Sequence, residues 1–455
     1  MCGVVGVYSE NPEITSVITY YTLYSLQHRG QESAGIAIRS DSIKLHKGMG
    51  LITEVFNDNI LKKFRGKISI GHVRYSTTGE SKIENAQPIF VRSKAGELAI
   101  GHNGNLVNYS QLKIMLQNEG KVFLTDTDTE VIAQLFSSFL IRNDVVKALE
   151  LLTRKLIGSY SITAIFNDTL IAYRDPLGFR PLCIGETDFG YVIASESCAL
   201  DSIGAKKIRD LKPGEAVIVE DGNAEFIRIC KKKRLARCVF EYIYFARPDS
   251  ILDGVNVYKA RYKMGRILAR ESPVSCDIVS PIPDSGTTCA IGFSHELRIP
   301  YLESLIKNRY VGRTFIMPEQ KAREISVRLK INIVKENIYN KRVVLVDDSI
   351  VRGTTSKKIV KMVKDAGAKE VHVRIGSPPI IAPCYFGIDM STREELIASG
   401  RSIEEIRKIL CADSLSYLSL NGLIKAIGFD RDELCLACLT GIYPVHVPGE
   451  ICEIE

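Results

Sequence analysis

The first half of the chain alternates short apolar runs with glycine and asparagine, which is typical of β-strands joined by tight turns. The runs read SAGIAIRS, GKISIGHVRYS, ELAIGHNGNL, SYSITAIFND, TLIAYRD, YVIASES and EAVIVEDGNAEFIRI. Two segments, near residues 13–26 and 130–140, instead have the pattern of helices. We therefore predict stacked β-sheets with helices on the outside.

The pattern changes to strand, turn and helix from about residue 276 onward. The segments are CDIVSPIPDSGTTCAIGFS, KRVVLVDDSIVRGTTSKKIVKMVKDAG and KEVHVRIGSPPI. Strands that alternate with helices in this way indicate a parallel α/β sheet. Because 455 residues exceed what one hydrophobic core usually covers, we predict two domains, residues 1–230 and 231–455, divided within a basic segment.

Composition narrows the class of protein. With 45% hydrophobic and 25% charged residues, the chain is an ordinary globular sequence, and a net charge of +7 is too weak to indicate nucleic-acid binding. No apolar stretch is long enough for a membrane helix, and the start does not resemble a signal peptide. We therefore expect a cytoplasmic protein in which the twelve cysteines serve chemistry or metal binding rather than disulfides.

The stretch RVVLVDDSIVRGTTSKK carries the strongest chemical signal. Asp347 and Asp348 follow an apolar strand, at the edge where open α/β sheets bind ligands, and paired carboxylates there suit a diol and magnesium. The next residues offer hydroxyls and backbone N–H groups at the start of a helix, which favours an anion. They are Arg352, Gly353, Thr354, Thr355 and Ser356. An isolated DDS would more simply be a polar turn with a helix cap.

The whole stretch resembles the motif with which type I phosphoribosyltransferases bind 5-phosphoribosyl 1-pyrophosphate (PRPP). The resemblance implies that a second turn contacts pyrophosphate and that magnesium lies near Ser285, Asp347 and Asp348. The residues of this second turn are Asp284, Ser285, Gly286 and Thr287. It also implies a mobile loop over PRPP in the basic segment 307–330, for which a solvated surface loop is the alternative.

A cysteine stands second in the chain. Removal of Met1 would leave an α-amino group and a thiol on Cys2, and an amino group with a pKa of about 8 can accept the thiol proton. The alternative is that Cys2 is a small apolar residue at the start of a buried strand.

Four polar motifs in the first half have a use if glutamine is the substrate: HRGQESAG, HVRYSTTG, HNGN and TDTDTE. Arg74 can pair with its α-carboxylate and Asp128 with its α-ammonium group. Asn103 and the N–H of Gly104 can stabilise the oxyanion that forms when a thiolate attacks the amide. Each residue alone also suits a polar surface or a turn. With Cys2, they resemble an N-terminal-nucleophile glutamine amidotransferase domain.

The two halves together resemble the amidophosphoribosyltransferase family. The resemblance implies an α+β N-terminal-nucleophile sandwich (αββα) followed by an α/β phosphoribosyltransferase domain. It implies glutamine-dependent amination of PRPP to 5-phosphoribosylamine, with passage of ammonia between the sites, feedback by purine nucleotides, and a homodimer or homotetramer. The alternatives are a PRPP-sensing regulator without turnover and another glutamine amidotransferase, such as a sugar-phosphate aminotransferase.

Four of the cysteines form a separate group. Cys435 and Cys438 make a C-x-x-C pair, and with Cys238 and Cys384 they suit a four-thiolate site. A zinc site, a redox pair and buried thiols are the alternatives. Their surroundings resemble the iron–sulfur branch of the family, which implies a [4Fe-4S] cluster. Relatives in that branch often carry a propeptide, whereas here we expect removal of Met1 to be sufficient.

Overall fold

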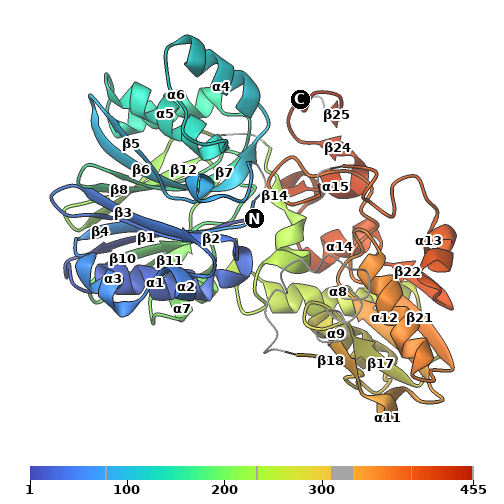
Figure 1. The fold of residues 1–455 in the computed structure, drawn as a ribbon. Helices are drawn as coiled ribbons and strands as arrows, with labels where there is room; N and C mark the ends of the chain where they lie inside the picture. The colour runs from blue at the N-terminus through green and yellow to red at the C-terminus, as the bar shows by residue number, and fades with distance from the viewer. Residues whose placement is uncertain (77–78, 232–233, 309–330, 391, 453–455) are drawn as a thin grey trace.

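The computed structural model describes residues 1–76, 79–231, 234–308, 331–390 and 392–452. They form two lobes, one from the first half of the chain and one from the second (Figure 1). The large sheets of the first lobe are antiparallel, and the main sheet of the second lobe is parallel. The predicted αββα sandwich followed by a parallel α/β unit is confirmed.

One sheet of the first lobe has seven strands in the order β11-β9-β10-β1-β4-β2-β3. The strands are β1 (Gly3–Ser9), β2 (Ser33–Arg39), β3 (Ile43–Met49), β4 (Ile68–Arg74), β9 (Cys183–Thr187), β10 (Gly190–Ala194) and β11 (Lys206–Asp210). Strand β1 is central, paired with β10 on one side and β4 on the other. All seven of its residues are buried because both faces of the sheet are covered. The N-terminus is therefore anchored in the interior.

The other large sheet has six strands in the order β13-β12-β8-β7-β6-β5. They are β5 (Ile89–Ser93), β6 (Gly96–Leu106), β7 (Gly158–Phe166), β8 (Thr169–Arg174), β12 (Glu215–Glu220) and β13 (Asn223–Arg228). The two sheets pack face to face over a buried apolar layer that includes Val4, Ile70, Ala99 and Ile165. This packing brings the ends of β1, β4 and β6 together.

Helices cover the outer faces of both sheets (Figure 1). The first sheet is covered by α1 (Thr15–Ser25), α2 (Ile52–Val55), α3 (Asp58–Lys63) and α7 (Ser197–Asp201). The second is covered by α4 (Tyr109–Asn118), α5 (Asp128–Leu140) and α6 (Val145–Lys155). The helices predicted near residues 13–26 and 130–140 are α1 and α5, and both predictions are confirmed. The 3₁₀ turns η1 (Gln27–Arg29) and η2 (Ile83–Asn85) complete this lobe.

The second lobe contains a four-stranded parallel sheet in the order β17-β20-β21-β22. Its strands are β17 (Ile278–Pro281), β20 (Arg342–Asp347), β21 (Glu370–Ile375) and β22 (Ser414–Tyr417). The helices are α8 (Val257–Glu271), α9 (Thr287–Leu297), α11 (Lys335–Ile338), α12 (Thr354–Asp365), α13 (Ile403–Leu410), α14 (Leu420–Ile427) and α15 (Ala437–Thr440). The sequence pattern from residue 276 therefore predicts this sheet correctly.

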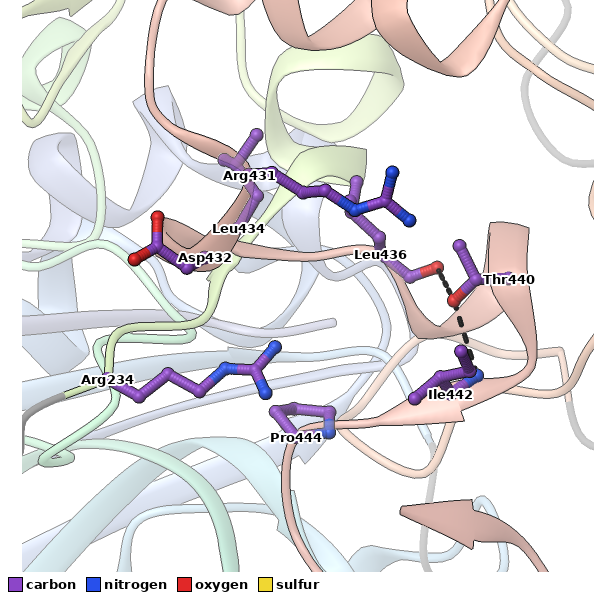
Figure 2. A pocket seen from close by; sticks show the side chains of 8 residues that line it. All are labelled: Arg234, Arg431, Asp432, Leu434, Leu436, Thr440, Ile442 and Pro444. Carbon is purple, nitrogen blue, oxygen red and sulfur yellow. Dashed lines mark hydrogen bonds between the residues drawn. The ribbon is translucent and has the colours of Figure 1, made fainter. Parts of the chain in front are cut away.

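Short elements connect this sheet to the rest of the chain. They are β14 (Arg237–Cys238), η3 (Glu241–Phe245), β15 (Ile251–Leu252), β16 (Val255–Asn256), β18 (Leu305–Lys307), β19 (Ile331–Ile333), η4 (Arg431–Glu433), β23 (Leu434–Cys435), β24 (Ile442–Tyr443) and β25 (Ile451–Cys452). The C-terminal ones frame a pocket of about 320 Å³ (Figure 2). Its lining residues are Arg234, Arg431, Asp432, Leu434, Leu436, Thr440, Ile442 and Pro444.

The junction between the lobes lies after the last strand of the large sheets. Strand β13 ends at Arg228, and the next strand, β14, begins at Arg237. The predicted division between residues 230 and 231 falls in this interval and stays a prediction. None of the helices in the described ranges has the length and apolar character needed to span a lipid bilayer.

Close packing of α8 against α9 gives a test of the second lobe. A Cβ atom at Gly265 would lie 1.9 Å from the carbonyl oxygen of Cys289. We expect Gly265→Ala to lower the free energy of unfolding by about 1–3 kcal/mol, because the helices must move apart, although alanine favours a helix more than glycine does. Denaturant unfolding measures this change. The exposed Lys263→Ala on the same helix should change stability by less than about 0.5 kcal/mol. Equal stability of Gly265→Ala and the unmodified protein would contradict the packing.

Candidate functional site

Cys2 directly precedes the central strand β1. Gly3 pairs with Val73 of β4, so Cys2 lies beside Arg74 at the end of that strand. The backbone N–H of Cys2 donates to Oδ1 of Asn103 at 3.1 Å, and its Sγ lies 3.5 Å from the carbonyl oxygen of Tyr75. The predicted nucleophile is therefore buried and held from two neighbouring strands.

Asn103 and Gly104 lie on β6, next to Cys2. The Nδ2 group of Asn103 is buried and has no hydrogen-bond partner within the described part of the chain. A buried donor without a partner is costly, so it is suited to an acceptor that the substrate brings. A Cβ atom at Gly104 would lie 2.0 Å from the carbonyl oxygen of Ser159, so only glycine fits there. An unpartnered donor beside the cysteine is one component that an oxyanion-binding site requires.

Arg74 and Asp128 come from two different elements, the end of β4 and the start of α5. Arg74 is buried and donates to the carbonyl oxygens of Gly79 and Glu80 at 3.1 Å each. Asp128 begins α5, and its Oδ2 accepts from the backbone N–H of Leu106 at 3.0 Å. The structure thus brings all five predicted glutamine-site residues to one place, and their individual roles stay predictions.

His102 was missed by the sequence analysis, although it stands in the quoted HNGN motif. It is buried, with Nδ1 3.5 Å from Oδ1 of Asp128 and 3.3 Å from the hydroxyl of Thr129. Burial lowers the pKa of His102, but the charge of Asp128 and the hydrogen bonds outweigh it, so the pKa is raised. The histidine therefore supports the carboxylate that was predicted to bind the substrate's ammonium group.

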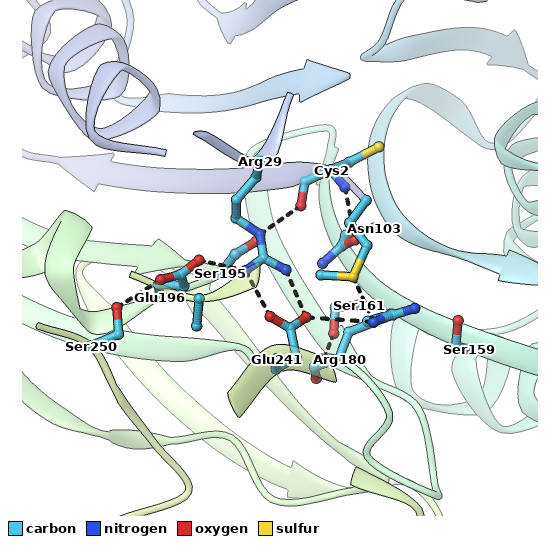
Figure 3. Close-up of polar contacts among 12 residues, drawn as sticks. Cys2, Arg29, Asn103, Ser159, Ser161, Arg180, Ser195, Glu196, Glu241 and Ser250 are labelled. Carbon is cyan, nitrogen blue, oxygen red and sulfur yellow. Dashed lines mark hydrogen bonds and ion pairs between the residues drawn. The ribbon is translucent and has the colours of Figure 1, made fainter. Parts of the chain in front are cut away.

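A buried group of charges surrounds the N-terminus (Figure 3). Nε of Arg29 donates to the carbonyl oxygen of Cys2 at 3.0 Å, and Arg29 also binds Glu196 and Glu241. Burial lowers the pKa of the Met1 amino group to about 6, with Arg180 and Arg29 acting in the same direction and Cys2 and Glu241 opposing them. Burial at this position therefore favours the neutral form of the Met1 amino group. Sequence reasoning assigned no role to Arg29.

The predicted PRPP residues lie at the carboxyl end of β20. Asp347 and Asp348 are buried, and the backbone N–H of Asp348 donates to Oδ1 of Asp347 at 2.9 Å. Burial, followed by the neighbouring charge of Asp348, raises the pKa of Asp347 well above its usual value. No positive side chain of the described residues is among its main influences. Two crowded carboxylates with this environment fit a divalent cation or the hydroxyls of a ribose.

The turn after β20 leads into α12. Gly353 has φ of 74° and is buried, which places the first turn of the 12-residue helix beside the strand end. Thr354 and Thr355 are exposed there, with backbone N–H groups that have no helical partner. The guanidinium of Arg352, however, donates to Glu395 at 2.7 Å, so in this conformation it points to a carboxylate rather than to an anion site.

The second predicted turn lies next to the first. A Cβ atom at Gly286 would be 2.3 Å from the carbonyl oxygen of Val346, so this turn touches β20. Ser285 is half-buried, Thr287 begins α9, and the exposed Asp284 pairs with Lys307 at 2.6 Å. The basic residues predicted to cover PRPP, 309–330, lie outside the described residues.

The four predicted cluster cysteines also converge. Cys238 on β14 pairs with Cys435 on β23, and the backbone N–H of Ile381 donates to the carbonyl oxygen of Cys438 at 2.9 Å. Burial, followed by the charges of Cys384, Cys435 and Cys238, raises the pKa of Cys438. As the side chains stand, the described ranges contain no group of three or more His, Cys, Asp or Glu arranged to hold a metal ion.

Three comparisons with known proteins agree with this geometry. A family model described as a glutamine amidotransferase domain matches residues 72–202. The amidophosphoribosyltransferases of Archaeoglobus fulgidus and Methanocaldococcus jannaschii are 63% and 53% identical to this chain, over 100% and 99% of both sequences. A solved structure, glutamine PRPP amidotransferase from B. subtilis complexed with ADP and GMP, matches with a TM-score of 0.92 at 48% identity, over 98% of each chain.

The fold and the two sites define a glutamine amidotransferase joined to a phosphoribosyltransferase. The chain belongs to the amidophosphoribosyltransferase family, the glutamine-dependent PRPP amidotransferases of purine biosynthesis. The relatives named above do not favour the alternatives of a PRPP sensor or a sugar-phosphate aminotransferase.

The unpartnered Nδ2 group of Asn103 gives a direct test. Asn103→Asp keeps an oxygen for the Cys2 N–H but replaces the donor with an acceptor that repels an oxyanion. We expect glutamine-dependent turnover to fall about 10²–10³-fold, the usual cost of losing an oxyanion donor. Turnover with ammonia should be retained. The control is Asn108→Asp, since the side chain of Asn108 bonds to backbone groups of residues 155 and 157, outside the glutamine site. Unchanged glutamine use in Asn103→Asp would refute the oxyanion role.

Proposed function

We propose that this chain aminates PRPP with ammonia that Cys2 releases from glutamine, and that two sites in the two lobes divide this work. The products are 5-phosphoribosylamine, pyrophosphate and glutamate. The observation that best supports the glutamine half is the buried, unpartnered Nδ2 group of Asn103 beside Cys2.

At the first site, the α-amino group of Cys2 accepts the thiol proton once Met1 has been removed. The thiolate attacks the amide carbon of glutamine, and the resulting oxyanion accepts hydrogen bonds from Asn103 Nδ2 and the N–H of Gly104. The C–N bond of the substrate amide then breaks. The α-ammonium group of Cys2 donates its proton to the leaving nitrogen, which departs as ammonia. Water hydrolyses the thioester to glutamate and regenerates the thiol.

Arg74 and Asp128 orient glutamine for this attack. The guanidinium of Arg74 takes the α-carboxylate, and the carboxylate of Asp128 takes the α-ammonium group. Asp128 is held by the N–H of Leu106 and by His102, so its position is set before the substrate arrives. This supports a site that recognises both charges of a free amino acid.

At the second site, ammonia attacks C1 of PRPP and pyrophosphate leaves. Asp347, Asp348 and Ser285 are the residues that would hold Mg²⁺, directly or through water and ribose hydroxyls. When bound, the ion offsets the negative charge that develops on the leaving pyrophosphate. The ribose phosphate group of PRPP, as distinct from its pyrophosphate, binds at the start of α12. Thr354, Thr355 and Ser356 contribute hydroxyls and backbone N–H groups there.

Ammonia passes between the sites without entering bulk water. The side chain of Met1 is buried in the same apolar cluster as Phe240 and Ile388 of the second lobe. Loss of Met1 therefore leaves space that runs from Cys2 toward the transferase lobe. The segment at Tyr385 also touches the glutamine site, because the side chain of Asn105 donates to its carbonyl oxygen at 2.9 Å. Both observations support a protected passage.

The cysteines Cys238, Cys384, Cys435 and Cys438 would hold a [4Fe-4S] cluster through their four thiolates. Their convergence from separate segments supports this ligand set, with three of the thiols buried and Cys384 half-buried. Because a relative was solved with ADP and GMP, we also propose feedback by purine nucleotides near the PRPP site. We also propose that the protein is a homodimer or homotetramer and that it is cytoplasmic.

The division of work between the two sites predicts different phenotypes in two variants. Cys2→Ala should lose glutamine-dependent turnover at least 10³-fold and keep ammonia-dependent turnover, since it removes only the nucleophile. Asp347→Asn with Asp348→Asn should lose turnover with both nitrogen donors. Pyrophosphate release from PRPP, measured with glutamine or ammonia, separates the two sites.

The control for these variants is Cys230→Ser, a half-buried cysteine outside both sites, which should behave like the unmodified protein. Glutamine use by Cys2→Ala would refute the nucleophile assignment. Normal ammonia-dependent turnover in the double aspartate variant would refute the PRPP assignment.

The cluster proposal is tested by metal content. Anaerobically purified protein should contain about four iron atoms per chain and show a broad visible absorption band. Cys438→Ser should lose both, whereas Cys411→Ser, at an exposed cysteine away from the group, should not. Colourless protein with one zinc ion per chain would contradict the cluster.

A further inference from the structure

Arg29 is the centre of the buried charges around the nucleophile. Its side chain is fully buried, and its Nε donates to the carbonyl oxygen of Cys2 at 3.0 Å. The other two nitrogens bind carboxylates: Nη1 contacts Glu196 and Glu241, and Nη2 contacts Glu241 at 2.8 Å. Each of the three nitrogens of the planar guanidinium therefore donates at least one hydrogen bond, which fixes the orientation of the group (Figure 3).

One of these carboxylates comes from the other lobe. Glu196 follows β10 in the first lobe, here called the glutaminase lobe. Glu241 begins η3 (Glu241–Phe245), after β14 of the second lobe, here called the transferase lobe. Glu241 is 1% exposed and binds Arg29 with both oxygens, at 2.8 and 3.0 Å. Its Oε1 is also 3.6 Å from Arg180. Taking a carboxylate this far out of water is unfavourable without such partners.

The turn that carries Glu241 is also held from the PRPP side. Arg261 of α8 is buried and donates to the carbonyl oxygens of Tyr242 and Ala246 at 2.8 Å each. Burial lowers the pKa of Arg261, and the charge of Asp348 is the strongest influence that opposes it. The five-residue turn therefore lies between the nucleophile and the acidic end of β20.

From this arrangement we propose that Glu241 is a positioning residue for glutamine hydrolysis: acting through Arg29, it fixes the backbone of Cys2 from the transferase lobe. The inference rests on the proposed nucleophilic role of Cys2. Glu241 touches neither substrate nor thiol, so it acts only through the guanidinium.

The geometry explains why the second carboxylate matters. Glu196 alone holds one edge of Arg29, and it is shared with His28, Ser250 and the N–H of Arg247. Glu241 fixes the remaining edge with two hydrogen bonds, which sets the direction of Nε toward Cys2. Without it, Arg29 is free to tilt, and a displacement of about 1 Å at a nucleophile costs roughly 10²-fold in rate.

Kinetics of Glu241→Gln in the full chain test this proposal. We expect kcat with glutamine to fall about 10- to 100-fold, with KM for glutamine changed less than about threefold, because Arg74 and Asp128 still bind the substrate. The rate with ammonia should stay within about twofold. A merely structural role would instead lower both rates, since the lobes would separate.

Asp253→Asn is the matched control. Asp253 forms another ion pair between the lobes, with the buried Arg174 at 2.7 and 2.8 Å. It also accepts from Arg237 at 3.0 Å, and none of its hydrogen bonds within the described residues goes to Met1 or Cys2. Its variant should leave the ratio of the glutamine rate to the ammonia rate unchanged. A ratio lowered equally in Asp253→Asn and Glu241→Gln would overturn the proposal, as would an unchanged ratio in both.

A second variant keeps the test decisive if Glu241→Gln does not fold. Arg29→Lys retains the positive charge between the carboxylates but lacks the fork that also reaches Cys2, and it should show the same selective fall in kcat with glutamine. Normal glutamine turnover in Arg29→Lys would overturn the proposal. Failure of the unmodified protein to use glutamine at all would instead refute the proposed function, so the two failures are distinguishable.

Discussion

A nucleophile at the end of a chain has a covalent neighbour on only one side, and the rest of the glutamine site depends on how this freedom is removed. Here Cys2 continues the central strand β1, so the sheet holds one side of it through β4. Asn103 holds its N–H group, and Arg29 holds its carbonyl oxygen. Once Met1 is removed, these contacts would replace the lost chain connection, because each binds a backbone group whose position the strand alone does not fix.

Arg29 and its two carboxylate partners are buried, and this burial explains why the two lobes are joined closely. Arg29 and Glu196 are each 0% exposed, and Glu241 is 1% exposed. Burial of an isolated ion is unfavourable by several kcal/mol, so each of these groups is stable only beside its partners. The pKa of Glu196 is accordingly held low despite burial, by His28 and Arg29. The glutaminase lobe thus completes its interior with a carboxylate from the transferase lobe.

The pattern of apolar and polar residues predicted those features of the fold that depend on neighbouring residues in the sequence. The apolar strand before Asp347 and Asp348 identified both the parallel sheet and the edge where the carboxylates lie, because strand direction determines where side chains after it gather. Helices α1 and α5 were predicted, whereas α4 and α6 were not separated from the loops around them. The pairing of Cys238 with Cys435 joins positions 197 residues apart in a strand pair of two residues each, which is too short to leave a periodic signal.

Three contacts between charged or titratable side chains far apart in sequence were not predicted, because neither a motif nor a local pattern pointed to them. Arg29 and Glu241 are 212 residues apart, and each looks like an ordinary surface charge until the fold buries both. His102 stands in a motif that was assigned for its neighbours, and only the position of Asp128 gives it a role. Arg352 was predicted from a motif to face phosphate, but Glu395, 43 residues later, holds it elsewhere in this conformation.

Met1 lies where the two lobes meet beside Cys2, the proposed nucleophile. Its side chain is 1% exposed, in the apolar cluster of the transferase lobe, and next to Arg180. While it is present, the amino group of Cys2 is part of a peptide bond and has no basicity. Its removal would create the base and, in the same step, empty the space between Cys2 and the second lobe. A single cleavage would thereby both activate the nucleophile and open the way by which its product leaves.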